Sequence, residues 1–549
     1  MASMADNSVA FPVLDATELG RLEAVGSRRS VGAGDYLFRE GDPAYDFYVV
    51  VSGAVDIFMR TDGGDRLVTR HGPGRFVGEL NLLTGQRTMV SAVVAEPGEV
   101  LVVGREAFRQ IIRTDPRLSD RILAAFLARR TELFSAASAA IRVVGSRFSP
   151  ELRPIREFLY RNRIPHELMD PDDDSHVEEV LREFEVTPEE LPVVIATGSV
   201  LRRPTPGALA EYLGLTVESL PGRCFDLVVV GAGPAGLAAA VYGASEGLET
   251  LALDKIAVGG QAGTSSRIEN YFGFPIGISG GDLTQRAMVQ AEKFGARLVN
   301  PCAAVSLREK AGHLVVDLTD GTAVAGRAVI VATGARYRRL DAARLDHFEP
   351  NGVYYAATEM EARLCAGSPV VVAGGGNSAG QASLFLADKG SHVTIVVRGP
   401  DLSASMSRYL IDRVEAHERV DVRSSTSITA LDGDQALSTV LVTGKDGDDA
   451  IPCAALFSFI GADPSSGWLS GCAALDEKGF VLTDRSLGPE HLGDRWEIFA
   501  RSPLPFETSH PGLFAVGDVR SGSTKRVAAA VGEGSAAVRS VHEYLSFSH

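Results

Sequence analysis

The chain of 549 residues is poor in cysteine, with only five. No two cysteines are close enough in sequence to form a local redox pair, and their scatter favours a reducing compartment. No apolar run reaches the roughly 18 residues needed to cross a bilayer. Residues 1–10 also lack the basic start and apolar core of a secretory signal. We therefore expect a cytoplasmic protein that does not contact a membrane.

Basic residues are in the minority: 54 Lys and Arg stand against 70 Asp and Glu, a formal net charge of −16. This balance argues against nonspecific binding of nucleic acid and fits a soluble protein or one with a basic partner. The length and the hydrophobic content of 45% suffice for three or four domains. No grouping of residues predicts a metal site.

A glycine-rich loop, GAGPAGL, occupies residues 231–237 directly after an apolar run. This context is typical of a Rossmann fold, in which Gly231 makes the turn, Gly233 lets the backbone approach a pyrophosphate and Gly236 allows close packing of helix on strand. The pyrophosphate is expected at the helix N-terminus. Asp254, which ends the next strand, is expected to accept a hydrogen bond from a ribose hydroxyl.

A second loop, AGGGNSAG at residues 373–380, follows another apolar strand. Its candidates for cofactor contacts are small or short polar residues: Gly374, Gly376, Asn377, Ser378 and Ala379. Two of the glycines and the alanine fill the same three roles as in the first loop. The next strand ends at Arg398, where a carboxylate would select an unphosphorylated ribose. A basic residue favours a 2′-phosphate, so we expect NADPH, with NADH as the alternative.

Further segments accompany the two loops, at residues 259–261, 269–271, 332–334, 515–518 and 526–528. On these motifs, residues 224–545 resemble the low-molecular-weight thioredoxin reductases, which are flavoproteins with two dinucleotide-binding domains. The resemblance implies FAD contacts, beyond the first loop, at these positions: Gly260, Gln261, Asn270, Gly334, Gly517, Asp518, Arg526, Val527 and Ala528. It also implies that the helix after Lys525 points its N-terminus at the flavin, where a helix dipole stabilises negative charge.

That family carries a Cys-x-x-Cys pair between its two halves, and this chain has Ala356 and Glu359 at the two positions. Cys365 is the nearest substitute. Six helical residues place it about 9 Å further along and on the opposite face, so we interpret it as a small buried hydrophobe. Glu359 is interpreted as a first-turn helix carboxylate or, alternatively, as a proton donor over the flavin. The catalytic residues stay open, with Glu359 and Cys365 as weak candidates.

The N-terminal 140 residues have a different pattern from the rest. Short alternating strands at residues 46–59 and 90–103, broken by glycine turns, predict an antiparallel β-roll. Within it, residues 76–88 (FVGELNLLTGQRT) resemble the phosphate-binding cassette of cyclic nucleotide-binding domains.

This second resemblance implies a cyclic nucleotide site with contacts from Gly78, Glu79, Arg87 and Thr88. In the family the glutamate binds the ribose 2′-hydroxyl, the arginine pairs with the cyclic phosphate, and helix N-terminal amides help to hold the anion. The alternative is a roll that binds no nucleotide and serves dimerisation or interdomain contact.

Residues 118–140, after the roll, have a helical pattern. In relatives of the catabolite activator such a helix pairs two subunits, so a homodimer is expected. No helix-turn-helix follows, which argues against a transcription factor.

Residues 141–222 predict alternating strands and helices in an order that resembles a thioredoxin or glutaredoxin domain. Residues 191–193 (Leu-Pro-Val) then correspond to the cis-proline segment. The redox position reads Ser149-Pro150-Glu151-Leu152, without cysteine, and Ser149 suits a helix cap. We interpret the unit as a thiol-less spacer or docking module.

The sequence thus predicts a multidomain protein with these units: a cyclic nucleotide-binding-like β-roll (1–140), a thioredoxin-like α/β domain (141–222), an FAD domain (223–350 and 468–549) and an NAD(P)H domain (351–467). The predicted activity is electron transfer from NADPH through flavin to an acceptor other than an internal disulfide, such as a protein carrier, a quinone or oxygen, with regulation by a cyclic nucleotide as a further hypothesis. Two alternatives stay open: a noncatalytic flavin or nucleotide sensor, and thioredoxin reduction through Cys365 or a partner's thiols.

Overall fold

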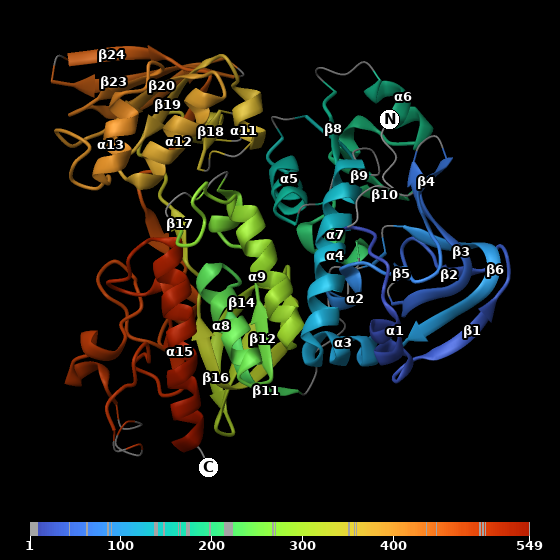
Figure 1. The fold of residues 1–549 in the computed structure, drawn as a ribbon. Helices are drawn as coiled ribbons and strands as arrows, with labels where there is room; N and C mark the ends of the chain where they lie inside the picture. The colour runs from blue at the N-terminus through green and yellow to red at the C-terminus, as the bar shows by residue number, and fades with distance from the viewer. Residues whose placement is uncertain are drawn as a thin grey trace.

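The computed structural model describes residues 9–547, except residues 43, 62–63, 85–86, 89, 137–140, 147–148, 163, 165, 172–175, 197–198, 214–222, 266–267, 269–270, 350–351, 356, 358, 435, 446, 494–495, 497–498 and 500. An antiparallel roll comes first, then a small α/β unit, then two larger α/β domains, one of which is inserted into the other (Figure 1). None of the helices described there is long and apolar enough to pass through a bilayer.

The roll confirms the predicted antiparallel architecture. Its elements are α1 (Ala16–Glu23), β1 (Ser27–Val31), β2 (Tyr36–Phe38), β3 (Phe47–Thr61), β4 (Gly64–His71), β5 (Phe76–Val77), α2 (Asn81–Thr84), β6 (Ser91–Val103), α3 (Arg105–Thr114) and α4 (Pro116–Ala136). The strand order is β1-β6-β3-β4, with β2 on β6 and β5 on β3. Phe108 and Phe126, from α3 and α4, are fully buried against the sheet.

The helix α4, which was expected to pair two subunits, packs one face within the chain. Leu118, Ile122 and Phe126 are fully buried in the core of the roll. On the FAD-domain side, Asp120 pairs with Lys293 at 3.5 Å. The described side chains of α4 therefore give no support for a helix-mediated homodimer, which stays a prediction.

The second unit contains the strands and helices expected for residues 141–222, as far as residue 213. They are β7 (Ile141–Val144), α5 (Leu152–Arg161), β8 (Glu167–Met169), α6 (Val177–Glu183), β9 (Val193–Ala196), β10 (Ser199–Arg202) and α7 (Pro206–Tyr212), with the turn η2 (Pro188–Glu190). The sheet order is β10-β9-β7-β8, with only β7 and β8 parallel. The Leu191–Pro192 peptide is cis, as predicted.

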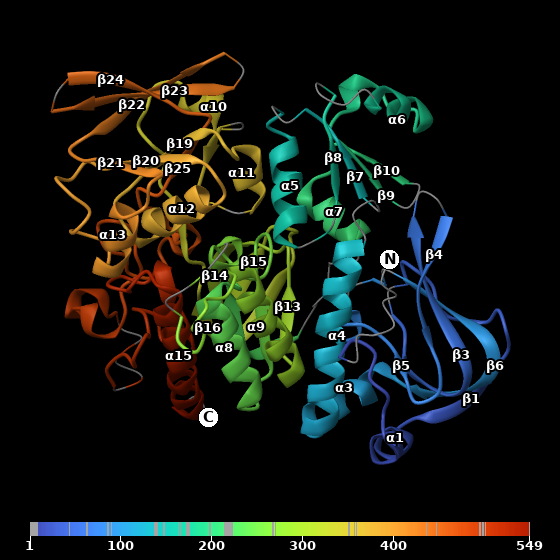
Figure 2. The same cartoon turned by 45° about the horizontal axis from the view of Figure 1, so that its top comes forward.

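The FAD domain is built on a largely parallel sheet of order β13-β12-β11-β16-β15-β14, with β27 beside β16. The strands are β11 (Cys224–Val230), β12 (Thr250–Leu253), β13 (Arg297–Val299), β14 (Ala304–Lys310), β15 (His313–Leu318), β16 (Ala323–Val331) and β27 (Leu513–Ala515). The helices are α8 (Pro234–Ser245), α9 (Gly280–Phe294) and α15 (Val527–Phe547), with short turns η3 (Ala262–Thr264), η4 (Gly467–Leu469), η5 (Asp484–Ser486), η6 (Pro489–His491) and η7 (Gly517–Val519). Figure 2 shows α8 between α15 and α9.

The inserted domain has a parallel sheet of order β18-β25-β19-β20-β21 and a separate antiparallel sheet, β22-β23-β24. Its elements are α10 (Leu345–Phe348), β18 (Val353–Tyr354), α11 (Glu359–Leu364), β19 (Pro369–Ala373), α12 (Asn377–Asp388), β20 (His392–Val396), α13 (Arg408–Glu415), β21 (Val420–Arg423), β22 (Ser427–Gly433), β23 (Leu437–Gly444), β24 (Gly447–Pro452) and β25 (Ala455–Ser458). β17 (Ala335–Tyr337) pairs with β26 (Ala462–Pro464) where the two domains join.

The predicted boundary at residue 350 is wrong. Leu345 and Phe348 of α10 are buried in the same apolar cluster as Val353 and Val371, inside the inserted domain. The chain therefore leaves the FAD domain at β17, before α10. On the return, Leu469 lies in the FAD-domain core, next to the predicted boundary at residue 468.

Candidate functional site

The first glycine-rich loop lies at the carboxyl end of β11 and has the geometry expected of a dinucleotide turn. Gly231 has φ +105°, and a Cβ there would lie 2.3 Å from the carbonyl oxygen of Ala332. A Cβ on Gly236 would lie 1.7 Å from the carbonyl oxygen of Gly231. At Gly233 the nearest atom is 3.7 Å away, so the backbone there is open to a ligand. The turn at Gly231 and the close packing at Gly236 follow the predicted geometry, and the approach of a pyrophosphate at Gly233 stays a prediction.

The Asp254 carboxylate accepts hydrogen bonds from the backbone of this loop. It is 8% exposed, and its Oδ2 accepts the N–H of Ala232 at 2.9 Å. Its Oδ1 accepts the N–H groups of Ile256 and Ala257 at 3.0 and 3.1 Å. The carboxylate therefore holds two turns in place, and its predicted bond to a ribose hydroxyl remains a prediction.

A second FAD segment, the Gly259-Gly260-Gln261 turn, meets the first loop. A Cβ on Gly260, which has φ +54°, would lie 2.7 Å from the Cα of Gly233. Gln261 is exposed beside it. Asn270, the other predicted contact in this region, lies outside the described residues.

The third segment predicted to contact FAD, after the 231–237 loop and the 259–261 turn, is the turn η7, which packs on α15. The backbone N–H of Gly517 donates to Glu533 Oε2 at 2.7 Å, and Arg520 pairs with the same carboxylate at 2.6 Å. Burial raises the pKa of Asp518, an effect that the ammonium group of Lys525 opposes. Lys525 Nζ also donates to the carbonyl oxygen of Asp518 at 2.6 Å.

The remaining predicted FAD contacts are at the start of α15 and at Gly334. Arg526 and Ala528 are exposed and Val527 is half-buried, and at Gly334, which has φ +66°, no atom would lie within 4 Å of a Cβ. Further along α15, a Cβ on Gly534 would lie 2.0 Å from the carbonyl oxygen of Ala235. This contact brings α15 against α8.

The sequence interpretation missed Glu533 and Gly534. The signal for Gly534 was present, because a glycine inside a helix indicates close packing. Glu533 had no local signal, because its partners are a backbone N–H and an arginine in another segment.

These three segments fit an FAD. Glycines occur where they approach one another, and Gly233, the N-cap of α8, has no side-chain cap. The first amides of α8 are thus available for a pyrophosphate, which a helix N-terminus binds well.

The second glycine-rich loop repeats the design in the inserted domain. Gly374 has φ +135°, and a Cβ there would lie 2.4 Å from the carbonyl oxygen of Phe459. Gly376 caps α12 without a side-chain bond, and the nearest atom to a Cβ there is 4.0 Å away. Ala379, in the third position, is fully buried.

Two polar residues flank this second loop. The side chain of Asn377 accepts the N–H of Ser407 at 2.7 Å, which holds the loop against the segment before α13. Ser378 is exposed, and Arg398 is exposed just after β20. An arginine in this position is accessible to a ribose phosphate.

All five cysteines are free thiols, with no disulfide between any two of them. Cys365 is 2% exposed, and its Sγ donates to the carbonyl oxygen of Glu361 at 3.1 Å. Burial raises the pKa of this thiol. This burial agrees with the interpretation of Cys365 as a small buried hydrophobe, and the choice of catalytic residue stays a prediction. Glu359 is the first residue of α11, and its side chain lies outside the described part of the structure.

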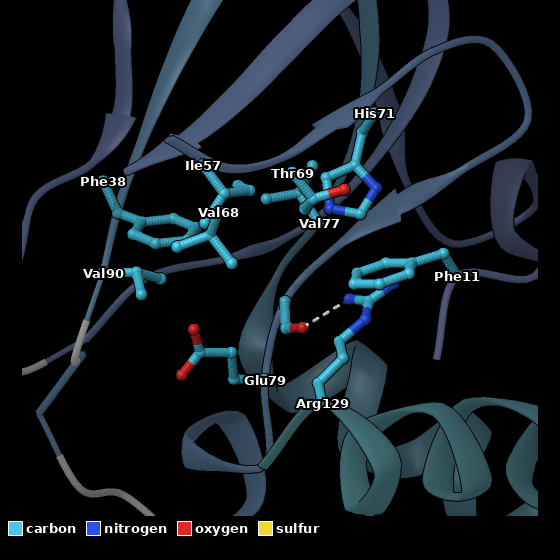
Figure 3. Close-up of a pocket in the computed structure, with 11 residues that line it drawn as sticks. Phe11, Phe38, Ile57, Val68, Thr69, His71, Val77, Glu79, Val90 and Arg129 are labelled. Atoms are coloured by element: carbon cyan, nitrogen blue, oxygen red, sulfur yellow. Dashed lines mark hydrogen bonds between the residues drawn. The ribbon is translucent and has the colours of Figure 1, made fainter. Parts of the chain in front are cut away.

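The roll has a pocket lined by Gly78 and Glu79 from the predicted cassette (Figure 3). Desolvation raises the pKa of Glu79 to about 7, although Arg129 and Arg130 oppose the rise. Arg87 is exposed, and its Nη1 donates to the carbonyl oxygen of Gly41 at 2.9 Å.

Thr88 is buried and donates to the carbonyl oxygen of Arg39 at 2.6 Å. Among the described residues, the pocket lining includes neither Arg87 nor Thr88. The structure therefore brings together only Gly78 and Glu79 of the four predicted nucleotide contacts. The sequence interpretation missed Arg129, which enters the pocket from α4.

Comparison with known families agrees with this geometry. The sequence model of the pyridine nucleotide-disulphide oxidoreductases matches residues 225–534, more than half of the chain. The chain belongs to this family. The model of the cyclic nucleotide-binding domain matches residues 28–115, which confirms the assignment of the roll.

Individual relatives of this oxidoreductase are thioredoxin reductases. The enzyme of Listeria innocua is 31% identical over 336 residues, 59% of this chain and 94% of the relative. That of Treponema pallidum is 32% identical over 325 residues, 58% of this chain and 97% of the relative. These matches confirm the predicted class of FAD-dependent NADPH oxidoreductase.

Solved structures give the same result for the fold. The crystal structure of Lactococcus lactis thioredoxin reductase in its FR conformation has a TM-score of 0.52 at 26% identity and covers 59% of this chain and 99% of its own. The thioredoxin reductase of T. acidophilum has a TM-score of 0.52 at 26% identity and covers 58% of this chain and 98% of its own. The two-domain flavoprotein fold is thereby confirmed.

Proposed function

We propose that this oxidoreductase passes electrons from NADPH to an acceptor outside the chain, and not to an internal disulfide. One observation carries the proposal: both glycine-rich loops have the close backbone approaches of a dinucleotide turn, whereas Ala356 and Glu359 stand where the related reductases are expected to have cysteines. Cys365 is buried and offers no replacement. The acceptor is therefore a separate molecule.

The residues of the two cradles have separable roles in this scheme. The amides that begin α8 and α12 bind the two pyrophosphates. Asp254 fixes the backbone of the first loop through hydrogen bonds, and Arg398 binds the 2′-phosphate of the nicotinamide cofactor. Bound FAD supplies the ability to take up a hydride and to release electrons onward.

An acceptor screen tests the external route. The purified holoprotein is assayed with NADPH and, in separate reactions, oxidised thioredoxin, a soluble quinone and oxygen. We expect turnover with at least one acceptor that is not a disulfide. Turnover with thioredoxin alone would contradict the proposal, because it would require a thiol relay that the chain has no pair to provide.

The second part of the proposal is that the roll regulates this activity. Its support is α9, a helix of 15 residues or about 22 Å, which packs on the FAD segment and on the roll. At its start, a Cβ on Gly280 would lie 1.7 Å from the carbonyl oxygen of Ala262, next to the Gly259–Gln261 turn. Near its end, Val289 is part of the roll's own apolar core.

Ionisable groups line this contact between α9 and the roll. Burial raises the pKa of Glu292 to about 8, although Arg130, Arg109 and Arg105 act in the opposite direction. Two of these arginines also bind the cassette helix α2: Arg105 donates to the carbonyl oxygen of Leu82 at 3.3 Å and Arg109 to that of Leu83 at 3.0 Å. A ligand that moves α2 would therefore change the surroundings of α9.

Such a ligand regulates the enzyme only if it binds one arrangement of the domains more tightly than another. The test is the NADPH turnover rate with and without cyclic AMP or cyclic GMP, together with nucleotide affinity with and without NADPH. We expect a change in both measurements, because coupling between two binding sites is reciprocal. Equal affinities would contradict regulation and leave the electron-transfer proposal intact.

The small α/β unit is proposed to be a thiol-less thioredoxin-like docking module. Its sheet order and the cis Pro192 support this assignment. Asn162 at the end of α5 donates to the carbonyl oxygen of Ile256 at 3.2 Å and accepts from Asn300 at 2.8 Å. The unit is thus fixed to the FAD domain beside Asp254.

A further inference from the structure

The small α/β unit precedes the oxidoreductase match, which begins at residue 225, but the end of its helix α5 contacts the FAD domain beside β13 (Figure 2). Asn162 is the C-cap of α5. Its Nδ2 donates to the carbonyl oxygen of Phe158 in α5 at 2.9 Å and to that of Ile256 at 3.2 Å. Its Oδ1 accepts from Asn300 Nδ2 at 2.8 Å. A side-chain amide has two donor hydrogens and one acceptor oxygen, so the amide of Asn162 bonds to three segments of the chain at once.

The turn after β12 is the first FAD-domain segment that Asn162 contacts, and it carries Asp254, the predicted ribose ligand. The backbone N–H of Ile256 donates to Asp254 Oδ1 at 3.0 Å. The carbonyl oxygen of the same Ile256 accepts from Asn162. A single residue therefore links the amide of Asn162 to the carboxylate of Asp254.

The loop after β13 is the second segment. In it, Asn300 lies between two residues that bond to the backbone of Asp254. The N–H of Asp254 donates to the carbonyl oxygen of Val299 at 2.9 Å, and the carbonyl oxygen of Asp254 accepts the N–H of Cys302 at 2.6 Å. Asn162 therefore bridges the two segments that hold Asp254 in place.

Charged side chains also meet where α5 contacts the FAD domain. The Arg161 side chain is 11% exposed and pairs with Glu157 at 3.3 Å. Burial lowers the pKa of Lys255 in the FAD domain, and from α5 Arg161 lowers it further while Glu157 raises it. Because these two residues of α5 act in opposite directions, charge adds little net attraction. The hydrogen bonds of Asn162 are the directional part of the contact.

We propose that Asn162 is a positioning residue for FAD. Through its amide, the small α/β unit holds Asp254 where the carboxylate accepts a hydrogen bond from the ribose of the adenosine half. A hydrogen bond weakens when its distance or angle departs from the optimum, so a turn that shifts binds the ribose less well. The small unit is thus a part of the flavin site. FAD binding needs no electron acceptor, so the inference does not depend on the acceptor route proposed above.

Titration of the flavin-free full-length chain with FAD and, separately, with FMN tests the proposal. FMN carries the flavin ring and one phosphate but no adenosine. Asn162→Ala raises the Kd for FAD by roughly tenfold, which is the effect of losing one or two neutral hydrogen bonds. The Kd for FMN is unchanged, because FMN places no ribose of an adenosine at Asp254.

Asn300→Ala is a second variant that leaves α5 intact. It removes the bond between Asn300 and Asn162 and keeps the bond of Asn162 to Phe158 within the small unit. The variant also raises the Kd for FAD and not that for FMN, so it carries the test if Asn162→Ala fails to fold. The double variant weakens FAD binding by less than the product of the two single effects, because both residues act through one contact.

Thr205→Ala is the matched control in the same unit. Thr205 is exposed, and its Oγ1 accepts the N–H of Ala208 at 3.2 Å at the start of α7. Loss of this N-cap weakens the small unit without a change at its contact with the FAD domain. The Kd values for FAD and FMN both stay at the wild-type level.

An unchanged Kd for FAD in the folded Asn162 and Asn300 variants overturns the inference. So do equal rises for FAD and FMN, which indicate a general loosening of the FAD domain. Reduction of the flavin by NADPH is recorded on the FAD-loaded samples. If that reduction is absent while the two flavins differ as described, the electron-transfer proposal fails and the positioning role of Asn162 stands.

Discussion

The two glycine-rich loops follow the same course and differ at two positions. In the third position, Gly236 has no room for a Cβ, whereas the corresponding Ala379 is accommodated and fully buried. After the next strand, Asp254 is buried and accepts three backbone N–H groups, whereas Arg398 is exposed. The first loop is thus fixed by its own backbone. The second loop is less tightly closed, and Arg398 beside it is exposed. This arrangement suits a nicotinamide cofactor that binds and dissociates in each turnover.

The largest expected effect comes from Gly236→Ala. The added Cβ would lie 1.7 Å from the carbonyl oxygen of Gly231, so the loop has to move. We expect loss of bound FAD, measured as the flavin-to-protein ratio after gel filtration. Ala379→Gly in the other loop is the matched change and costs about 1 kcal/mol of helix stability without loss of flavin. Full flavin content in Gly236→Ala would show that the loops do not differ as described.

Arg398→Ala sharpens the second difference. Loss of one charge-assisted bond of about 1.5–3 kcal/mol is expected to raise the KM for NADPH by roughly ten- to a hundredfold. The KM for NADH, which has no 2′-phosphate, stays nearly constant. Arg408→Ala, at another exposed arginine of the same domain, is the control. Equal changes for both cofactors would contradict the role of Arg398.

Glu292→Gln tests whether the Glu292 carboxyl is buried between the FAD domain and the roll. A carboxyl whose pKa is raised on folding contributes stability below its unfolded pKa of about 4.3, and the contribution is lost as pH rises. For Glu292 the loss continues to about pH 8. The variant should therefore show a flatter dependence of Tm on pH between these limits. Glu106→Gln, at an exposed carboxylate of α3, is the control. Identical slopes in wild type and Glu292→Gln would contradict the interpretation.

The smallest expected effect is that of Cys365→Ser. The thiol is buried among apolar side chains, and its Sγ donates to the carbonyl oxygens of Glu361 and, more weakly, Ala362. A hydroxyl can make the same bond, so NADPH turnover with the preferred acceptor should be unchanged. Loss of disulfide reductase activity in this variant would restore the thiol route that the structure argues against.

Local sequence patterns predicted much of this fold. Glycine turns bounded the strands of the roll, and the two dinucleotide loops were recognisable because their geometry admits few residues at three fixed positions. The α10 helix was assigned to the wrong domain, because Leu345 and Phe348 are apolar in either setting and only long-range packing decides which core they join.

The roles of Arg129 and Glu292 could not be predicted for the same reason. Arg129 contacts Ala10 and Gly78, which are far from it in sequence. Glu292 faces arginines of a different domain. Neither residue belongs to a local motif, so the sequence carried no signal for either contact.

Anaerobic mixing of the flavin-loaded protein with NADPH tests the central claim most directly. The account predicts rapid loss of the visible flavin absorption band, faster with NADPH than with NADH, and recovery of the band when an acceptor is added. A bound flavin that stays oxidised in excess NADPH would contradict the account and identify the chain as a noncatalytic sensor or scaffold.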